Sequence, residues 1–129
     1  MKRILFVCVE NSNRSQMAEA FARIEGGDSV EVSSAGSRPS GRINPKAIRA
    51  MAEAGYDLGT HASKSLDDVA GKAFDAVVTM GCGDACPWIP ATLREDWALP
   101  DPRDMDEVGY RAVRDMIRER VRTLLATLA

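Results

Sequence analysis

The sequence lacks several features that mark particular classes of protein. Its 129 residues contain no apolar run near the roughly 18 residues that a membrane-spanning helix needs, so we expect no transmembrane segment. The net charge of −2 offers no overall attraction to nucleic acid or to an anionic membrane, and any anion site must therefore be local. The basic start is followed by an apolar run too short for a signal peptide, which predicts a cytoplasmic protein.

Cysteine and histidine are scarce. The three cysteines, Cys8, Cys82 and Cys86, are an odd number, which argues against the disulfide framework of a secreted domain. Three cysteines and the single His61 provide no second closely spaced pair for a zinc site, so we predict no metal. We expect His61 to be a hydrogen-bonded loop residue, and nothing in the sequence calls for a cofactor. Free thiols without a function, two of them a structural pair, remain the alternative for the cysteines.

What the chain does have is the composition of an ordinary globular domain, with 45% hydrophobic and 28% charged residues. Its length predicts a single domain over residues 1–129. Apolar runs typical of buried strands alternate with helical patterns, which predicts a small doubly wound α/β fold: a four-stranded parallel sheet with helices on both faces. The expected strands are 3–8, 29–36, 74–80 and 96–100, and the segment 81–96 is expected to be largely irregular. The expected helices begin near residues 14, 45, 69 and 106.

In such a fold, ligands bind beyond the carboxyl ends of the strands. Cys8 ends the first predicted strand, and the loops after Met80 and Leu99 follow the third and fourth strands. Three segments that lie far apart in the sequence should therefore converge on one edge of the sheet.

The stretch Val7–Ser15, VCVENSNRS, places five residues between Cys8 and Arg14, at the turn from a buried strand into a helix. The backbone N–H groups of such a loop and the helix dipole can hold a tetrahedral oxyanion, and Arg14 can bind two of its oxygens. The same field favours the thiolate of Cys8, to which Ser15 can donate a hydrogen bond. Asn11 tolerates unusual turn conformations and can hold the shape of the loop.

We therefore predict a nucleophilic Cys8 beside a bound oxyanion. A buried structural cysteine with a surface arginine is the alternative. The residues predicted to bind the oxyanion are Val9, Glu10, Asn11, Ser12, Asn13 and Arg14.

A series of short segments extends this pattern over nearly the whole chain. In order, they are VCVENSNRSQMAEAF, SSAG, INPKAIRAMAEAGYD, HAS, FDAVVTM, CP and DP. Together they resemble the low-molecular-weight tyrosine phosphatase fold, and in particular the thioredoxin-coupled arsenate reductases that are built on it.

The resemblance implies reduction of arsenate to arsenite through a relay of thiols. Cys8 would attack arsenate, Cys82 would attack Cys8 as arsenite leaves, and Cys86 would move the disulfide toward the surface. An external thiol protein would then reduce the Cys82–Cys86 bond by exchange. Thioredoxin is the favoured reductant, and a glutaredoxin or a low-molecular-weight thiol is the alternative.

The resemblance also implies that Asp101, in the DP pair, protonates the leaving oxygen, whereas a solvated loop aspartate is the alternative. Two further cysteines have no use in a phosphatase, and DPRDMDE lacks the aromatic residues that usually flank this pair in tyrosine phosphatases. Both features favour a small inorganic substrate. A protein phosphatase and a non-catalytic arsenite or oxyanion sensor remain alternative functions.

The sequence departs from the family pattern in three respects, one of which is a shorter spacing between the two later cysteines. Asn13 stands where the reductases often have a cysteine, and we expect this difference to be tolerated. Some relatives bind a monovalent cation beside the loop, and Asn11, Glu19 and Ser34 match three of its ligands. Lys64 takes the place of the fourth, a carboxylate, so we predict no required cation.

Overall fold

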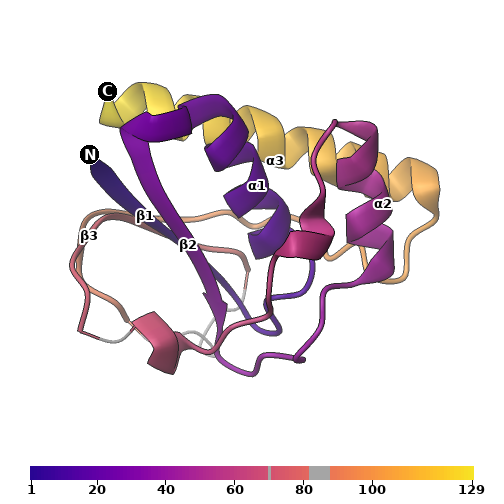
Figure 1. Cartoon of the computed structure of the whole chain (residues 1–129), viewed down its shortest axis with the longest axis horizontal. Helices are drawn as coiled ribbons and strands as arrows, with labels where there is room; N and C mark the ends of the chain where they lie inside the picture. Colours follow the sequence, from indigo (N-terminus) through magenta and orange to yellow (C-terminus); the bar gives the residue numbers. More distant parts are fainter. Residues whose placement is uncertain (70, 82–87) are drawn as a thin grey trace.

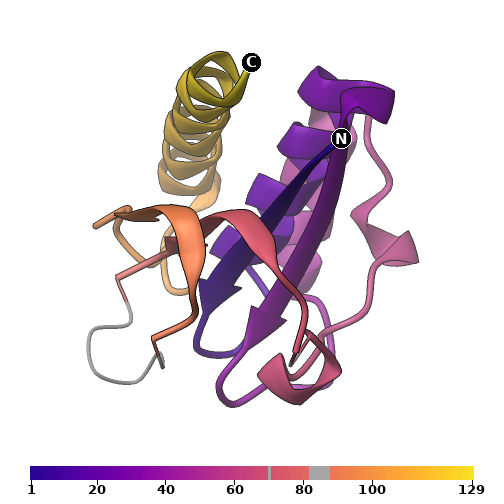
Figure 2. The same cartoon turned by 90° about the vertical axis from the view of Figure 1, so that its left-hand side faces the viewer.

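The computed structural model describes residues 1–69, 71–81 and 88–129, and Cys82 and Cys86 therefore lie outside the described residues. Its centre is a four-stranded parallel sheet with the strand order β2-β1-β3-β4 (Figures 1 and 2). The predicted α/β fold is confirmed. The strands are β1 (Lys2–Cys8), β2 (Val30–Gly36), β3 (Phe74–Thr79) and β4 (Ala91–Asp96).

In the described residues, helices follow three of the strands, and two of the α-helices begin at a residue whose side chain caps them. The Asn44 side chain accepts a hydrogen bond from Lys46 N, and the Asp106 side chain accepts one from Gly109 N. No helix of the described residues is long and apolar enough to cross a membrane. The α-helices are α1 (Arg14–Gly26), α2 (Pro45–Glu53) and α3 (Glu107–Leu128), and the 3-10 helices are η1 (Gly27–Ser29), η2 (Leu58–Thr60) and η3 (Leu66–Val69).

The two faces of the sheet are covered differently. Ile4 and Phe6 point to the face that packs against α1, α2 and α3, whereas Leu5 and Val7 point to the other face. That second face packs against η3, which lies on the opposite side of the sheet from the three α-helices (Figure 1). Because side chains alternate along a strand, β1 contributes to both cores and is buried from Ile4 onward.

The fourth strand was predicted in the wrong place. It lies at Ala91–Asp96, inside the segment expected to be irregular, and does not include residues 97–100. β4 is an edge strand whose side chains are alternately half-buried and exposed, so the polar sequence ATLRED can form it. Trp97 and Leu99 are buried as irregular chain beyond the strand, and their apolar pattern indicated burial rather than pairing.

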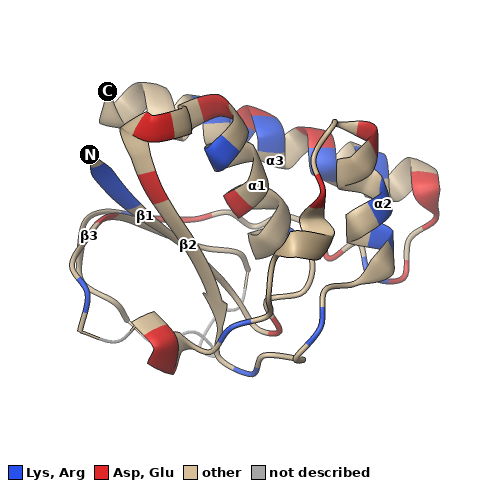
Figure 3. Cartoon of the chain, in the orientation of Figure 1, with Lys and Arg blue, Asp and Glu red and all other residues tan. Residues whose placement is uncertain are grey.

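Charges of both signs are spread over the outer surfaces of α2 and α3 (Figure 3). Glu53 on α2 forms exposed ion pairs with Arg111 and Arg114 on α3. Exposed pairs contribute little free energy to folding, so the packing of the helices depends on their apolar faces.

Candidate active site

The segment 8–15, here called the Cys8 loop, joins β1 to α1 as predicted. The backbone carbonyl groups of residues 9–12 accept hydrogen bonds from donors outside the loop, mostly from N–H groups of the neighbouring segment 38–44. The acceptor and donor pairs are Val9 O with Arg38 N (2.8 Å), Glu10 O with Ser40 N (3.0 Å), Asn11 O with Gln16 Nε2 (3.1 Å) and Ser12 O with Asn44 N (3.0 Å).

These bonds decide where the amide groups of the Cys8 loop point. In a trans peptide the N–H group points away from the preceding carbonyl, and the described chain has no cis peptide bond. The N–H groups of residues 10–13 therefore turn to the inner side of the loop, where Asn11 N lies 3.2 Å from Cys8 Sγ and donates to it. A concave set of backbone donors of this kind can accept an anion.

The Cys8 thiol is buried and accepts a second hydrogen bond, whose direction follows from its neighbours. Lys64 N donates to Asn11 Oδ1 at 2.7 Å, which identifies this atom as the side-chain oxygen. The Asn11 amide group must then donate to Ser15 Oγ at 2.9 Å. The hydroxyl hydrogen of Ser15 is left to point at Cys8 Sγ, 2.7 Å away. Two hydrogen-bond donors thus face the sulfur.

Asn11 holds the bend of the Cys8 loop. Its φ of 52° is in the left-handed region, and it is the only residue other than glycine there in the described parts of the chain. This confirms the prediction that asparagine is used for an unusual turn.

Gln16 and His61 hold the Asn11 side chain in place through a chain of hydrogen bonds. This role of Gln16 was not predicted from the sequence. The Gln16 amide nitrogen lies 2.8 Å from Asn11 Oδ1 and 2.9 Å from Ala62 O, so its oxygen faces His61 Nδ1 at 2.9 Å. His61 therefore carries a proton on Nδ1 and accepts from Tyr56 OH through Nε2 at 2.6 Å. The prediction of a hydrogen-bonded loop histidine is confirmed. The sequence did contain a signal for Gln16, because it is a polar residue in the first turn of a helix, on a face that is otherwise apolar.

Burial lowers the pKa of His61, although the nearby Glu19 carboxylate opposes this shift. The imidazole is therefore neutral in this network. Glu19 is itself buried, accepts from Ser34 Oγ at 2.6 Å and lies 3.6 Å from Lys64 Nζ. The lysine thus brings its positive charge to the carboxylate.

Gly36 is a second residue whose role the sequence reasoning missed. It ends β2 beside the Cys8 loop, where an added Cβ would collide with Val9 O and come within 3.0 Å of Asn11 N. The SSAG segment pointed to this position, but only the tertiary contact explains why a side chain is excluded.

The segment 99–106, here called the Asp101 loop, faces the Cys8 loop across a cavity of about 280 Å³. Arg14 connects the two loops, since its Nη1 donates to Leu99 O at 2.8 Å. Asp101 is exposed, and its carboxylate accepts from Arg103 N at 3.0 Å. The residues that line this cavity are Cys8, Val9, Glu10, Ser12, Asn13, Arg14, Asp101 and Arg103.

Cys82 and Cys86 lie outside the described residues. The described chain before them ends at Gly81, whose backbone is so near Arg14 that an added Cβ would lie 3.4 Å from Nη1. The predicted convergence of three segments on one edge therefore holds for Cys8, Gly81 and Asp101.

Known proteins resemble the chain over its whole length. The family described as low molecular weight phosphotyrosine protein phosphatase matches residues 3–129. A glutaredoxin arsenate reductase of Synechocystis sp. is 38% identical over 132 residues, which cover 100% of both proteins. A solved arsenate reductase in the phosphate-binding state is 36% identical, with a TM-score of 0.91 and 100% of both chains covered. A thioredoxin-dependent arsenate reductase of Corynebacterium glutamicum, also 36% identical, has a TM-score of 0.83, with 98% of this chain and 61% of that chain covered.

Proposed function

The chain belongs to the low molecular weight phosphotyrosine protein phosphatase family, and we propose that within this family it is an enzyme that reduces arsenate to arsenite. The observation that carries the proposal is the pair of hydrogen bonds from Ser15 and Asn11 to Cys8 Sγ, in a cavity that also holds Arg14 and Asp101. The names of the similar proteins support arsenate as the substrate. The solved relative described as being in the phosphate-binding state supports a site for a tetrahedral anion.

In the first step, the inward N–H groups of the Cys8 loop and the Arg14 guanidinium bind arsenate. The Cys8 thiolate attacks arsenic and forms an arsenic–sulfur bond, while one arsenic–oxygen bond breaks. Asp101 supplies the proton with which that oxygen leaves as water. Arsenic remains in the +5 state at this point.

In the second step, the Cys82 thiolate attacks Cys8 Sγ. The electron pair of the arsenic–sulfur bond stays on arsenic, which leaves as arsenite in the +3 state. The two electrons come from the two sulfurs, which are now joined as a Cys8–Cys82 disulfide. Cys86 then attacks Cys82, which frees Cys8 and leaves a Cys82–Cys86 disulfide for an external dithiol.

We propose thioredoxin as this dithiol, and glutaredoxin is the second candidate because the Synechocystis relative bears its name. Either partner requires a reducing compartment, which favours the cytoplasm. Arsenite production should be measured with thioredoxin, its reductase and NADPH, and in parallel with glutathione and glutaredoxin. Cys8→Ser is the control that must abolish both signals. Arsenite retention without turnover in either system would instead indicate a sensor.

The relay has its own test. Cys82→Ser should still bind arsenate but release no arsenite, because the anion site does not use Cys82. Cys86→Ser should complete one round and retain a Cys8–Cys82 disulfide, detectable by mass spectrometry of non-reduced digests after one equivalent of arsenate. Steady turnover of Cys86→Ser with thioredoxin would remove Cys86 from the relay.

Family membership makes a phosphatase the second candidate function. Because the Asp101 loop contains no aromatic side chain to stack on a phosphotyrosine ring, we expect turnover of an aryl phosphate to be weak. Strong turnover of p-nitrophenyl phosphate without arsenite production would favour the phosphatase.

A further inference from the structure

Tyr110 is a buried tyrosine that the proposed chemistry does not use. It lies one turn into α3, and its hydroxyl donates to the side-chain oxygen of Asn13 in the Cys8 loop, 97 residues away in the sequence. Both side chains are buried. A buried phenol without a partner is costly, so this bond ties α3 to the Cys8 loop.

Asn13 serves this bond instead of the usual role of its position. It is the N-cap residue of α1, where an asparagine side chain commonly accepts from a first-turn N–H group and stabilises the helix by about 1 kcal/mol. Its side chain makes no such bond here. The first-turn N–H groups of α1 are thereby left for an anion, and the Asn13 oxygen is directed to α3.

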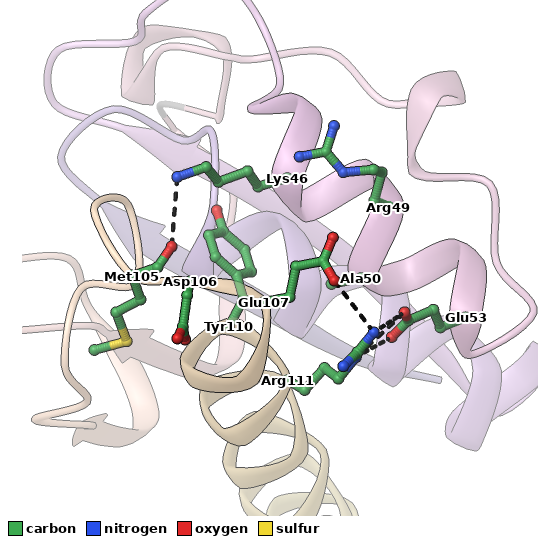
Figure 4. Close-up of a pocket in the computed structure, with 9 residues that line it drawn as sticks. All are labelled: Lys46, Arg49, Ala50, Glu53, Met105, Asp106, Glu107, Tyr110 and Arg111. Carbon is green, nitrogen blue, oxygen red and sulfur yellow. Dashed lines mark hydrogen bonds and ion pairs between the residues drawn. The ribbon is translucent and has the colours of Figure 1, made fainter.

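The Asp101 loop lies between these attachments and is held at four places. Its Arg103 guanidinium lies 3.5 Å from the Glu10 carboxylate of the Cys8 loop, in an exposed ion pair. Arg14 binds Leu99 O at the start of the Asp101 loop, as described above. Lys46 on α2 donates to Arg103 O at 3.2 Å. It also donates to Met105 O at 3.4 Å (Figure 4). At its end the loop enters α3, where Tyr110 binds Asn13. Of these attachments, the Tyr110–Asn13 bond is the one with both partners buried.

We propose that Asn13 and Tyr110 form a positioning pair that holds Asp101 at the correct distance from Cys8. The inference rests on the proposed function, in which Asp101 is the proton donor. Asp101 is exposed and bonded only within its own loop among the described contacts, so its position depends on how the two ends of the loop are anchored. Anchoring α3 directly to the Cys8 loop fixes one end of the Asp101 loop relative to the nucleophile.

The charges around the pair are consistent with this role. Burial raises the pKa of Tyr110, and the negative charge of Asp101 raises it further, while Arg49 opposes both effects. Tyr110 therefore remains a hydrogen-bond donor throughout the pH range of the reaction.

The test is the rate of arsenite release in the first turnover, measured without external reductant at several arsenate concentrations. Wild type is compared with Tyr110→Phe, Asp101→Asn and the double variant. Tyr110→Phe should slow the maximal rate about 10-fold and change the half-saturating arsenate concentration less than about 2-fold, since small displacements of a catalytic group cost rate. The double variant should be no slower than Asp101→Asn alone, because Tyr110 acts through Asp101.

Arg111→Gln is the matched control, because it breaks the exposed contact of α3 with Glu53 without touching Asn13, and it should keep the wild-type rate. Asn13→Ala is a second variant and should show the same dependence on Asp101. A normal rate in Tyr110→Phe, or additive slowing in the double variant, would overturn the positioning role. A normal rate in Asp101→Asn would also overturn the positioning role. If the wild-type protein releases no arsenite, both the proposed function and the positioning role are overturned.

Discussion

The two loops that face each other across the cavity are built in opposite ways. The Cys8 loop is buried, and its carbonyl groups, Asn11 side chain and Ser15 hydroxyl all have partners. The Asp101 loop is mostly exposed, and side chains from α1, α2 and the Cys8 loop hold it at a few places. One loop is thus part of the folded core, whereas the other rests on it.

This difference separates stability from activity. Removing a partner from a buried polar network leaves other groups unsatisfied, and each such group costs about 1–3 kcal/mol. Removing an exposed side chain changes folding by about 0.5 kcal/mol or less. Substitutions in the Cys8 loop should therefore affect both folding and turnover, and substitutions in the Asp101 loop should affect turnover alone.

The largest expected effect is at the residue that joins the two loops. Arg14→Lys should lower kcat/KM for arsenate about 10²–10³-fold, because lysine keeps the charge but cannot bind two anion oxygens and Leu99 O with one planar group. Steady-state kinetics with the favoured reductant measures this effect. Arg42→Lys, on the exposed neighbouring segment, is the matched control and should stay near wild type. A near-normal kcat/KM for Arg14→Lys would show that Arg14 does not bind the oxyanion.

Asn11→Ala should reduce the free energy of unfolding by about 3 kcal/mol. It leaves Lys64 N without its partner, removes one hydrogen bond each from Ser15 and Gln16, and places alanine in the left-handed region. Urea unfolding followed by circular dichroism measures the loss. Asp104→Ala in the exposed Asp101 loop is the comparison and should change the same quantity by about 0.5 kcal/mol or less. Equal losses in the two variants would contradict the contrast between the loops.

Asp101→Asn should slow arsenate turnover about 30-fold, because the amide cannot supply a proton to the leaving oxygen. Its unfolding free energy should stay within about 0.5 kcal/mol of wild type, since the side chain is exposed. Parallel kinetics and urea unfolding of the same preparation check both parts. A variant that loses stability and keeps its rate would reverse the roles assigned to the two loops.

The smallest expected effect concerns pH and His61. Its pKa is lowered in the folded state, so the unfolded state binds the proton more readily, and stability falls as pH drops below the unfolded value of about 6.5. The loss of unfolding free energy between about pH 7.5 and about pH 5.5 should therefore be larger in wild type than in His61→Gln. Hydrogen bonds from Arg111 hold the pKa of Glu53 at about 2, so this group stays charged throughout that interval. Equal slopes for the two proteins would show that His61 is not held neutral by the fold.

The sequence alone determined the parts of this protein that depend on near neighbours. The spacing of Cys8, Arg14 and Ser15 between a strand and a helix predicted the loop, because residues six or seven apart at such a junction must face each other. The caps at Asn44 and Asp106 and the left-handed Asn11 were predictable for the same reason, since each involves only a few residues of chain.

Only the tertiary structure decided the features that depend on distant partners. The place of β4 followed from an open edge of β3, and the exclusion of a side chain at Gly36 followed from the Cys8 loop beside it. The Tyr110–Asn13 pair joins residues 97 positions apart, and neither residue type signals its partner. Local patterns carry no information about such contacts, because the packing of whole elements brings the partners together only after the sheet and helices have formed.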